Sequence, residues 1–176
     1  MKQTSNRRGL LLAISALILA LDRFTKNWVS HHIEEGNAIT IIPRVFRISH
    51  VQNPGAAFSM FSDSPSPERT RWILIAFSLL AAAVVLGVLL RIGRRLTMTS
   101  LAMALVLGGA IGNAWDRIRY GTVVDFLEVH IVHYHWPDFN VADSAIVVGG
   151  LLLLLDALFS RQPSSAPSST EDKLNA

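Results

Sequence analysis

The stretch Trp72–Leu90, WILIAFSLLAAAVVLGVLL, decides the fold class because it contains no charged side chain. As a helix, a run of this length matches the thickness of the hydrocarbon core of a membrane, so it predicts a span over about residues 72–91. The composition of the whole chain agrees with this interpretation. Hydrophobic residues make up 51% of the 176 residues and charged residues 16%, whereas soluble domains carry about 25% charge. These values exclude an ordinary soluble domain and, for most of the chain, disorder.

Three further apolar segments predict spans at about 9–28, 96–116 and 141–160. The first and the last reach the required length only if Asp22 and Asp156 are tolerated near helix ends. The first could instead be a cleaved signal peptide, but Asp22-Arg23 follows its apolar run in place of a small-x-small cleavage site. We therefore expect an α-helical membrane protein with four transmembrane helices, in which residues 1–160 form a single membrane-embedded domain.

The distribution of basic residues predicts the orientation of these spans. Basic residues precede the first span and crowd the short joint between the second and third: Lys2, Arg7, Arg8, Arg91, Arg94 and Arg95. Such clusters are typical of the cytoplasmic side, so four spans would place both termini there. Residues 31–71 and a loop from about 119 to 140 would then be extracytoplasmic. Residues 161–176, rich in Ser and Pro, predict a disordered cytoplasmic tail. No basic stripe indicates nucleic-acid binding.

Polar residues near the outer ends of the spans are the candidates for function, because charge at membrane depth is unfavourable. Asp22 and Lys26 lie one helical turn apart and can form an ion pair, either as local structure or as part of a site. Asn113 and Arg117 have the same spacing. The spacing of Gly108 and Gly112 predicts close packing of another helix. The chain has no Cys, which excludes a thiol nucleophile and thiolate-bound zinc.

Two aspartates, Asp125 and Asp143, follow the third span and begin the fourth. Taken singly, Asp125 could be a turn residue in a wet loop, and Asp143 could be a carboxylate that stabilises a helix N-terminus. Taken together, they should lie at one membrane depth and could meet. Two carboxyl groups at close range do not both ionise readily, so one can act as a base toward water and the other as an acid toward a carbonyl. The pair thus predicts aspartic-protease chemistry without a metal.

Four sequence boxes, in order across the spans, resemble those of bacterial lipoprotein signal peptidases, also called type II or prolipoprotein signal peptidases. They are Asp22-Arg23-Phe24-Thr25-Lys26; Asn53-Pro54-Gly55-Ala56-Ala57-Phe58-Ser59; Gly109-Ala110-Ile111-Gly112-Asn113-Ala114-Trp115-Asp116-Arg117 with Val123-Val124-Asp125-Phe126; and Phe139-Asn140-Val141-Ala142-Asp143-Ser144. A single box would carry little weight, whereas the ordered set is specific and covers residues from about 10 to 160.

The resemblance implies an intramembrane aspartyl endopeptidase of the bacterial inner membrane. It would cleave diacylglyceryl-modified prolipoproteins immediately before the lipidated Cys, with Asp125 and Asp143 as its catalytic pair. Supporting or substrate-binding roles are implied for Asp22, Lys26, Asn53, Gly55, Asn113, Arg117 and Asn140. The resemblance also implies a small extracytoplasmic β-cradle over roughly 38–61, a lid segment, an active site near the outer leaflet, contact with membrane lipid, and inhibition by globomycin-type cyclic peptides. We expect a monomer with no metal and no cofactor.

Three other functions remain open from the residues alone. A Ser-Lys peptidase would need Lys26 as a base beside a serine such as Ser59, and would not need both aspartates. A metal-dependent membrane protein could use the imidazoles and carboxylate of the second outer loop, which are His130, His133, His135 and Asp138. The chain lacks an HExxH motif, and alternation along a strand would divide these residues over two faces. A small-molecule transporter without enzymatic activity is the third alternative.

Overall fold

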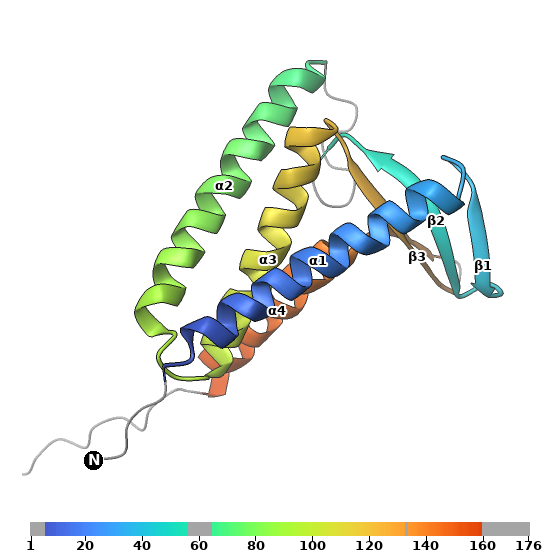
Figure 1. The fold of residues 1–176 in the computed structure, drawn as a ribbon. Coiled ribbons are helices and arrows are strands. Elements are labelled where there is room, and N and C mark those ends of the chain that lie inside the picture. Colours follow the sequence, from blue (N-terminus) through green and yellow to red (C-terminus); the bar gives the residue numbers. More distant parts are fainter. Residues whose placement is uncertain (1–5, 56–64, 133, 160–176) are drawn as a thin grey trace, which may run out of the picture.

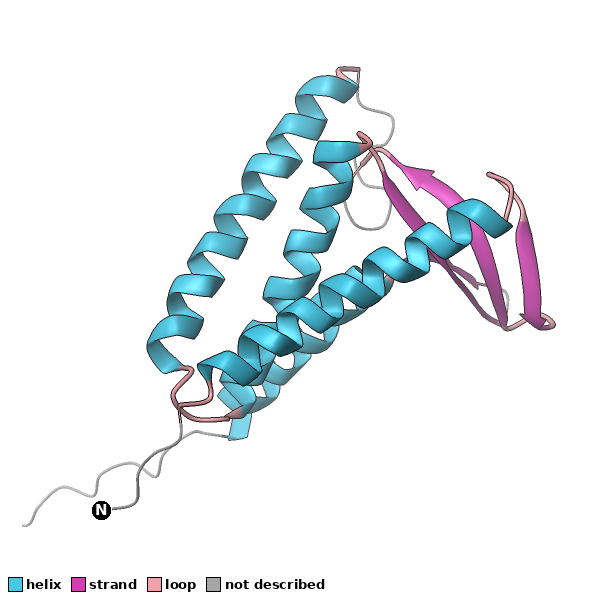
Figure 2. Cartoon of the chain, viewed as in Figure 1, coloured by secondary structure: helices cyan, strands magenta, loops and turns pink. Residues whose placement is uncertain are grey.

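Four long helices and one small sheet make up the protein in a computed structural model that describes residues 6–55, 65–132 and 134–159 (Figures 1 and 2). The helices are α1 (Arg8–His32), α2 (Pro67–Ile92), α3 (Met98–Arg119) and α4 (Val141–Phe159), and α3 contacts each of the other three. The beginning of α1, the α2–α3 connection and the end of α4 gather at one end of the helices. The sheet lies at the opposite end, beside the last turns of α1.

The helix boundaries follow from local sequence signals. Pro67 begins α2, where its missing N–H has no helical partner to lose, and the helix ends at Gly93. Thr97 and Ser100 form a reciprocal capping box at the start of α3. Helix α1 continues to His32, beyond the end of the span expected over about 9–28. Its polar last turns extend beyond the apolar run that hydropathy detects.

The sheet is an antiparallel meander in the order β1 (Ala38–Ile42), β2 (Phe46–Asn53), β3 (Val123–Ile131) and β4 (Tyr134–Phe139). The first two strands lie within residues 38–61, where the family resemblance implied a β-cradle. The second outer stretch was expected to be a loop, and this was wrong, because it supplies β3 and β4. Pairing of β2 with β3 sets Val51 opposite Asp125 and Asn53 opposite Val123. The sheet thus brings Asn53 of the second sequence box to the strand that carries Asp125.

A β-bulge interrupts the pairing of β3 with β4. Leu127 pairs with Phe139 and Val129 with Trp136, so β4 uses three steps where β3 uses two. The extra residue lies in the Pro137–Asp138 region. A bulge tolerates Pro137, which has no N–H to donate to a ladder. The irregularity also changes which face of β4 the following side chains occupy.

Two apolar clusters hold the helices and the sheet together. Leu11 of α1, Leu89 of α2 and Leu107 of α3 are buried in the first cluster. Val29 and Ile33 of α1 pack against Phe126 of β3 in the second. Glycines on α3 permit close helix packing, as their spacing predicted. A Cβ at Gly108 would lie 2.7 Å from the backbone oxygen of Ser15 on α1.

Among the described residues, α2, α3 and α4 are long and apolar enough to cross a membrane. Large apolar side chains on α2, such as Phe77 and Leu80, are exposed on the protein surface, as expected for a helix that faces lipid. The second half of α1 contains Asp22, Arg23 and Lys26, and these lower its hydropathy. The structure therefore defines a membrane protein with three clearly apolar helices and a small antiparallel sheet.

Candidate active site

Asn140, fully buried between β4 and α4, is the residue around which the two candidate aspartates gather. Its side-chain Nδ2 donates a 2.7 Å hydrogen bond to Oδ1 of Asp125. Its side-chain oxygen accepts a 2.9 Å bond from the backbone N–H of Asp143, while its own N–H donates to Oδ2 of Asp143 at 3.2 Å. This reciprocal arrangement caps α4 in the manner of a capping box. One asparagine therefore starts the helix and connects both carboxyl groups.

Asp125 lies on β3 with only 3% of its surface exposed. It is neither a turn residue nor in a wet loop. A second amide, Nδ2 of Asn53 on β2, donates to its Oδ2 at 2.8 Å. Burial and then the charge of Asp143 raise the pKa of Asp125 to about 7, although the two amide hydrogen bonds favour its charged form. This carboxyl group is therefore suited to hold a proton near neutral pH.

Asp143 lies in the first turn of α4, one strand beyond Asp125, because β4 separates the two in the chain. Its Oδ1 accepts a 2.7 Å hydrogen bond from Nδ2 of Asn113 on α3. The helix N-terminus also favours a negative charge there. Asp143 thus combines a helix-stabilising position with direct contact to two buried asparagines.

Lys26 connects this site to a second pair of carboxylates. Its Nζ donates to Oδ2 of Asp22 at 2.8 Å and to the side-chain oxygen of Asn113 at 3.1 Å, and it lies 2.7 Å from Oδ2 of Asp116. Asp22 also accepts a 3.0 Å bond from the backbone N–H of Ala142 at the start of α4. The lysine and both aspartates are buried. Deprotonation of Lys26 would leave two buried carboxylates without their shared counter-charge.

Gly55, which follows β2, is connected to the site by hydrogen bonds of its backbone N–H and C=O groups. Its N–H donates to the side-chain oxygen of Asn53 at 2.9 Å, and its carbonyl accepts a 2.5 Å bond from Nη2 of Arg117. Arg117 is itself buried on α3. Nε of Arg71, from the first turns of α2, donates to the carbonyl of Arg117 at 2.8 Å. These contacts fix Gly55 beside Asn53, whose amide bonds Asp125.

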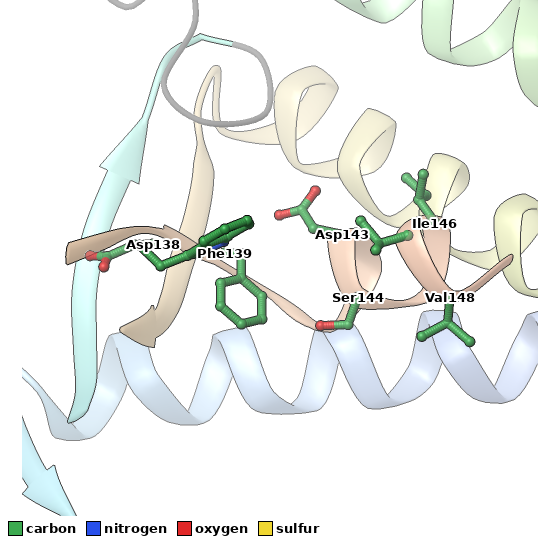
Figure 3. A pocket seen from close by; sticks show the side chains of 8 residues that line it. Asp138, Phe139, Asp143, Ser144, Ile146 and Val148 are labelled. Atoms are coloured by element: carbon green, nitrogen blue, oxygen red, sulfur yellow. The ribbon is translucent and has the colours of Figure 1, made fainter. Parts of the chain in front are cut away.

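A cavity of about 400 Å³ opens beside Asp143, between β4 and the first turns of α4. Figure 3 shows Asp143, Ser144, Ile146 and Val148 on α4, with Asp138 and Phe139 on β4. Trp136 and Val147 complete the lining. Most of this lining is apolar, so the cavity suits an apolar group next to a carboxyl group.

The structure brings all nine sequence-derived site residues into this region: Asp22, Lys26, Asn53, Gly55, Asn113, Arg117, Asp125, Asn140 and Asp143. The rest of the second box, residues 56–59, lies outside the described residues. His133 and the expected tail, residues 161–176, also lie outside the described residues.

Sequence reasoning assigned no role to three other residues near the site. Asp116 belongs to the third box and Arg23 to the first. They form an ion pair although they lie 93 positions apart, and no local sequence pattern predicts such a contact. In the sequence, Arg71 is the charged residue directly before the apolar run 72–90, and no pattern indicated its contact with Arg117. The charged residues at the outer end of the first span could have indicated that Arg23 needs an acidic partner, because unpaired charge at membrane depth is unfavourable.

The sequence comparisons identify the class and then the family. Residues 14–159 match the model of a peptidase family described as signal peptidase (SPase) II. A lipoprotein signal peptidase of Syntrophus aciditrophicus is 40% identical over 156 residues, covering 89% of this chain and 96% of the relative. One of Solibacter usitatus is 44% identical over 146 residues, covering 82% and 88%. The chain therefore belongs to the signal peptidase II family.

The fold comparison agrees with this membership. A solved bacterial membrane enzyme superimposes with a TM-score of 0.76 at 25% identity, covering 90% of this chain and 94% of the other. A second bacterial membrane enzyme gives a TM-score of 0.67 at 26% identity. The four helices and the small sheet are thus an arrangement found in bacterial membrane enzymes.

Proposed function

We propose that this protein is an aspartyl endopeptidase that removes the signal peptide from diacylglyceryl-modified prolipoproteins, cutting immediately before the lipidated Cys. Family membership and the lipoprotein signal peptidase relatives support the substrate class. The observation that supports the mechanism is that Asn140 forms hydrogen bonds with both Asp125 and Asp143.

The roles of the two aspartates follow from their surroundings. Asp125, with its pKa raised to about 7, holds the proton and donates it toward the scissile carbonyl. Asp143 accepts a proton from the attacking water. The new bond joins the water oxygen to the carbonyl carbon. The proton on Asp143 then passes to the leaving amide nitrogen as the C–N bond breaks, and the proton given by Asp125 returns to it as the carbonyl re-forms. Neither step needs a metal ion or a cofactor.

The remaining polar residues position these groups. Asn53, Asn113 and Asn140 orient the two carboxyl groups by their amide donors. Arg117 holds the backbone carbonyl of Gly55. Asp22 and Lys26 support the junction of α1, α3 and α4.

The substrate is a lipid-bearing chain, and the apolar cavity beside Asp143 offers it a matching surface. We assign the protein to the inner membrane with α1 as a fourth span. The cytoplasmic end carries the termini and the basic residues Arg8, Arg91 and Arg94. The active site lies near the outer leaflet, and the enzyme acts as a monomer that globomycin-type cyclic peptides inhibit.

Two alternative mechanisms have less support. A Ser-Lys mechanism requires a free lysine, but Lys26 is buried between two carboxylates. A metal mechanism based on the outer histidines would use His130 and His135, which lie on β3 and β4 beyond the aspartates, away from the contacts of Asn140. A transporter would produce flux across liposomes and no cleavage.

The test is single-turnover cleavage of a diacylglyceryl-modified prolipoprotein peptide by the full chain in detergent. Asp125→Asn keeps the shape of the side chain and should reduce the rate about 10²–10⁴-fold, the usual contribution of general acid-base catalysis. Asp156→Asn is the matched control, because Asp156 lies on α4 far from Asn140 and bonds Thr99. Wild-type turnover in Asp125→Asn, or complete loss of turnover in EDTA with recovery in zinc, would refute the proposal.

A further inference from the structure

A second polar cluster lies on the β3–β4 hairpin, apart from the two aspartates. Nε2 of His130 is 2.7 Å from Oε1 of Glu128, and Nε2 of His135 is 3.7 Å from the same oxygen. The two imidazole rings stack with centroids 4.9 Å apart. One ligand atom from each of the three residues lies within 4.8 Å of the others. Glu128 is buried, while both histidines reach solvent.

The sheet explains why these side chains meet. Glu128 and His130 are two residues apart on β3, so they project from one face. His135 is the direct cross-strand partner of His130, which sets their Cβ atoms close together. The bulge at Pro137–Asp138 then turns Asp138 to the same face, where its Oδ1 lies 3.3 Å from Nε2 of His135. Simple alternation would have separated His135 from Asp138, so the sequence-based expectation of a split was wrong for these residues.

We propose that Glu128, His130 and His135 form a binding site for a divalent transition-metal ion of the Zn²⁺ type, which joins β3 to β4. Imidazole nitrogen and carboxylate oxygen are the ligands that Zn²⁺ takes in proteins without Cys. With metal–ligand distances near 2.0–2.1 Å, ligand atoms on a tetrahedron are about 3.3–3.4 Å apart. The separations of 2.7 and 3.7 Å lie on either side of this value.

Neighbouring groups support the site. Oδ1 of Asp138 lies 3.3 Å from Nε2 of His135, next to the three ligand residues, and the Ser49 hydroxyl donates to Oδ2 of Asp138 at 3.1 Å, which orients that carboxylate. Arg47, opposite Glu128 on β2, lies 3.4 Å from Oε1 with its side chain 41% exposed. It is the counter-charge of Glu128 without a metal, and it can turn into solvent when an ion binds.

The site acts on the shape of the active-site cavity and takes no part in the proposed chemistry. Asp138 and Trp136 line the cavity beside Asp143, so an ion that fixes β4 to β3 fixes one wall of that cavity. The metal-free protein should therefore still cleave substrate. Because binding is measured without substrate, failure of this proposal leaves the aspartate mechanism untouched, and the reverse also holds.

The experiment titrates the tag-free, chelator-stripped full chain in detergent with ZnCl₂ by calorimetry and with CoCl₂ by visible absorption. We expect one equivalent of Zn²⁺ to bind with Kd on the order of 1–10 µM, and Co²⁺ to give the strong absorption bands of a tetrahedral site. His135→Gln, at an exposed position that should fold normally, should weaken binding by at least about tenfold. Arg47→Gln should tighten it, because it removes a competing positive charge.

His32→Gln on α1 is the matched control, because His32 is another exposed imidazole, bonded through Nδ1 to the carbonyl of Trp28. Its Kd should equal that of the wild type. The proposal is overturned if the wild type binds less than one equivalent below about 100 µM, or if His135→Gln and His32→Gln bind alike. Melting temperatures of the metal-free variants show whether each is folded.

Discussion

Two pairs of aspartates lie side by side in this molecule, and they differ in what connects them. Asp22 and Asp116 have an ammonium group between them, Nζ of Lys26, within 2.8 Å of each. Asp125 and Asp143 have the amide and backbone of Asn140 between them. A cation stabilises two negative charges together, whereas a neutral asparagine leaves the repulsion in place, so one acid keeps its proton. Under the proposed mechanism, the bridging group distinguishes the buried acid pair that holds the fold from the pair that performs acid-base chemistry.

Asn113 joins the two pairs. Its side-chain oxygen accepts from Lys26, and its amide nitrogen donates to Asp143. The pair joined by Lys26 therefore fixes the orientation of an amide that positions the proposed catalytic pair. A change in one pair should therefore be measured for its effect on the other.

The largest effect should come from the pair connected by Asn140. Asp143→Asn should reduce single-turnover cleavage about 10²–10⁴-fold, as Asp125→Asn should, because either change removes acid-base transfer. The double variant should be little worse than either single one, since the two groups act as a unit. At neutral pH none of the three variants should melt below the wild type, since Asn keeps the shape of the side chain without its buried charge. Multiplicative losses in the double variant would show that the two aspartates act independently.

The next effect concerns the pair connected by Lys26. Lys26→Met leaves Asp22 and Asp116 buried without their shared cation, which should reduce the unfolding free energy by about 3–5 kcal/mol. Asp22→Asn should be milder, because Asn can still accept the Ala142 N–H bond. Yield and melting temperature in detergent are the measurements. Normal stability in Lys26→Met, with cleavage abolished, would instead assign Lys26 to the chemistry.

The smallest and most specific effect is on pH dependence. The pKa of Asp125 is raised from 3.8 to about 7, so the folded protein binds this proton more tightly than the unfolded chain. Its contribution to stability is present below about pH 4 and is lost as pH rises through 7, on the order of a few kcal/mol in total. Cleavage should fall above pH 7 for the same reason. Asp125→Asn should flatten the dependence of melting temperature on pH between about 4 and 7, whereas Asp156→Asn should retain the wild-type slope.

Much of the fold could be predicted from hydropathy, because long uncharged runs such as 72–90 have few alternatives to a helix. The four ordered boxes likewise indicated the site residues. Strands β3 and β4 were missed because Glu128, His130 and His135 interrupt the apolar alternation that marks a strand. The ladder partners of β3 on β2 lie some 75 positions earlier in the chain, and local patterns carry no such information.

The network around Lys26 shows the same limit at the level of single residues. The i, i+4 spacing predicted the contact of Asp22 with Lys26, which the structure contains. The second acid, Asp116, comes from another helix, and Arg23 adds an ion pair to it. Gly112 explains how close these helices come, because a Cβ there would lie 2.9 Å from Oδ2 of Asp22.

The bulge in β4 makes this part of the chain more sensitive to insertions and deletions than to substitutions. Side chains alternate along a strand, so one residue more or less at Pro137 would reverse the face of every residue that follows within the strand. Phe139 would leave the cavity, and Asn140, directly after it, would begin α4 from a rotated position. Substitution of Pro137 should therefore disturb the start of α4 less than a change in the length of β4.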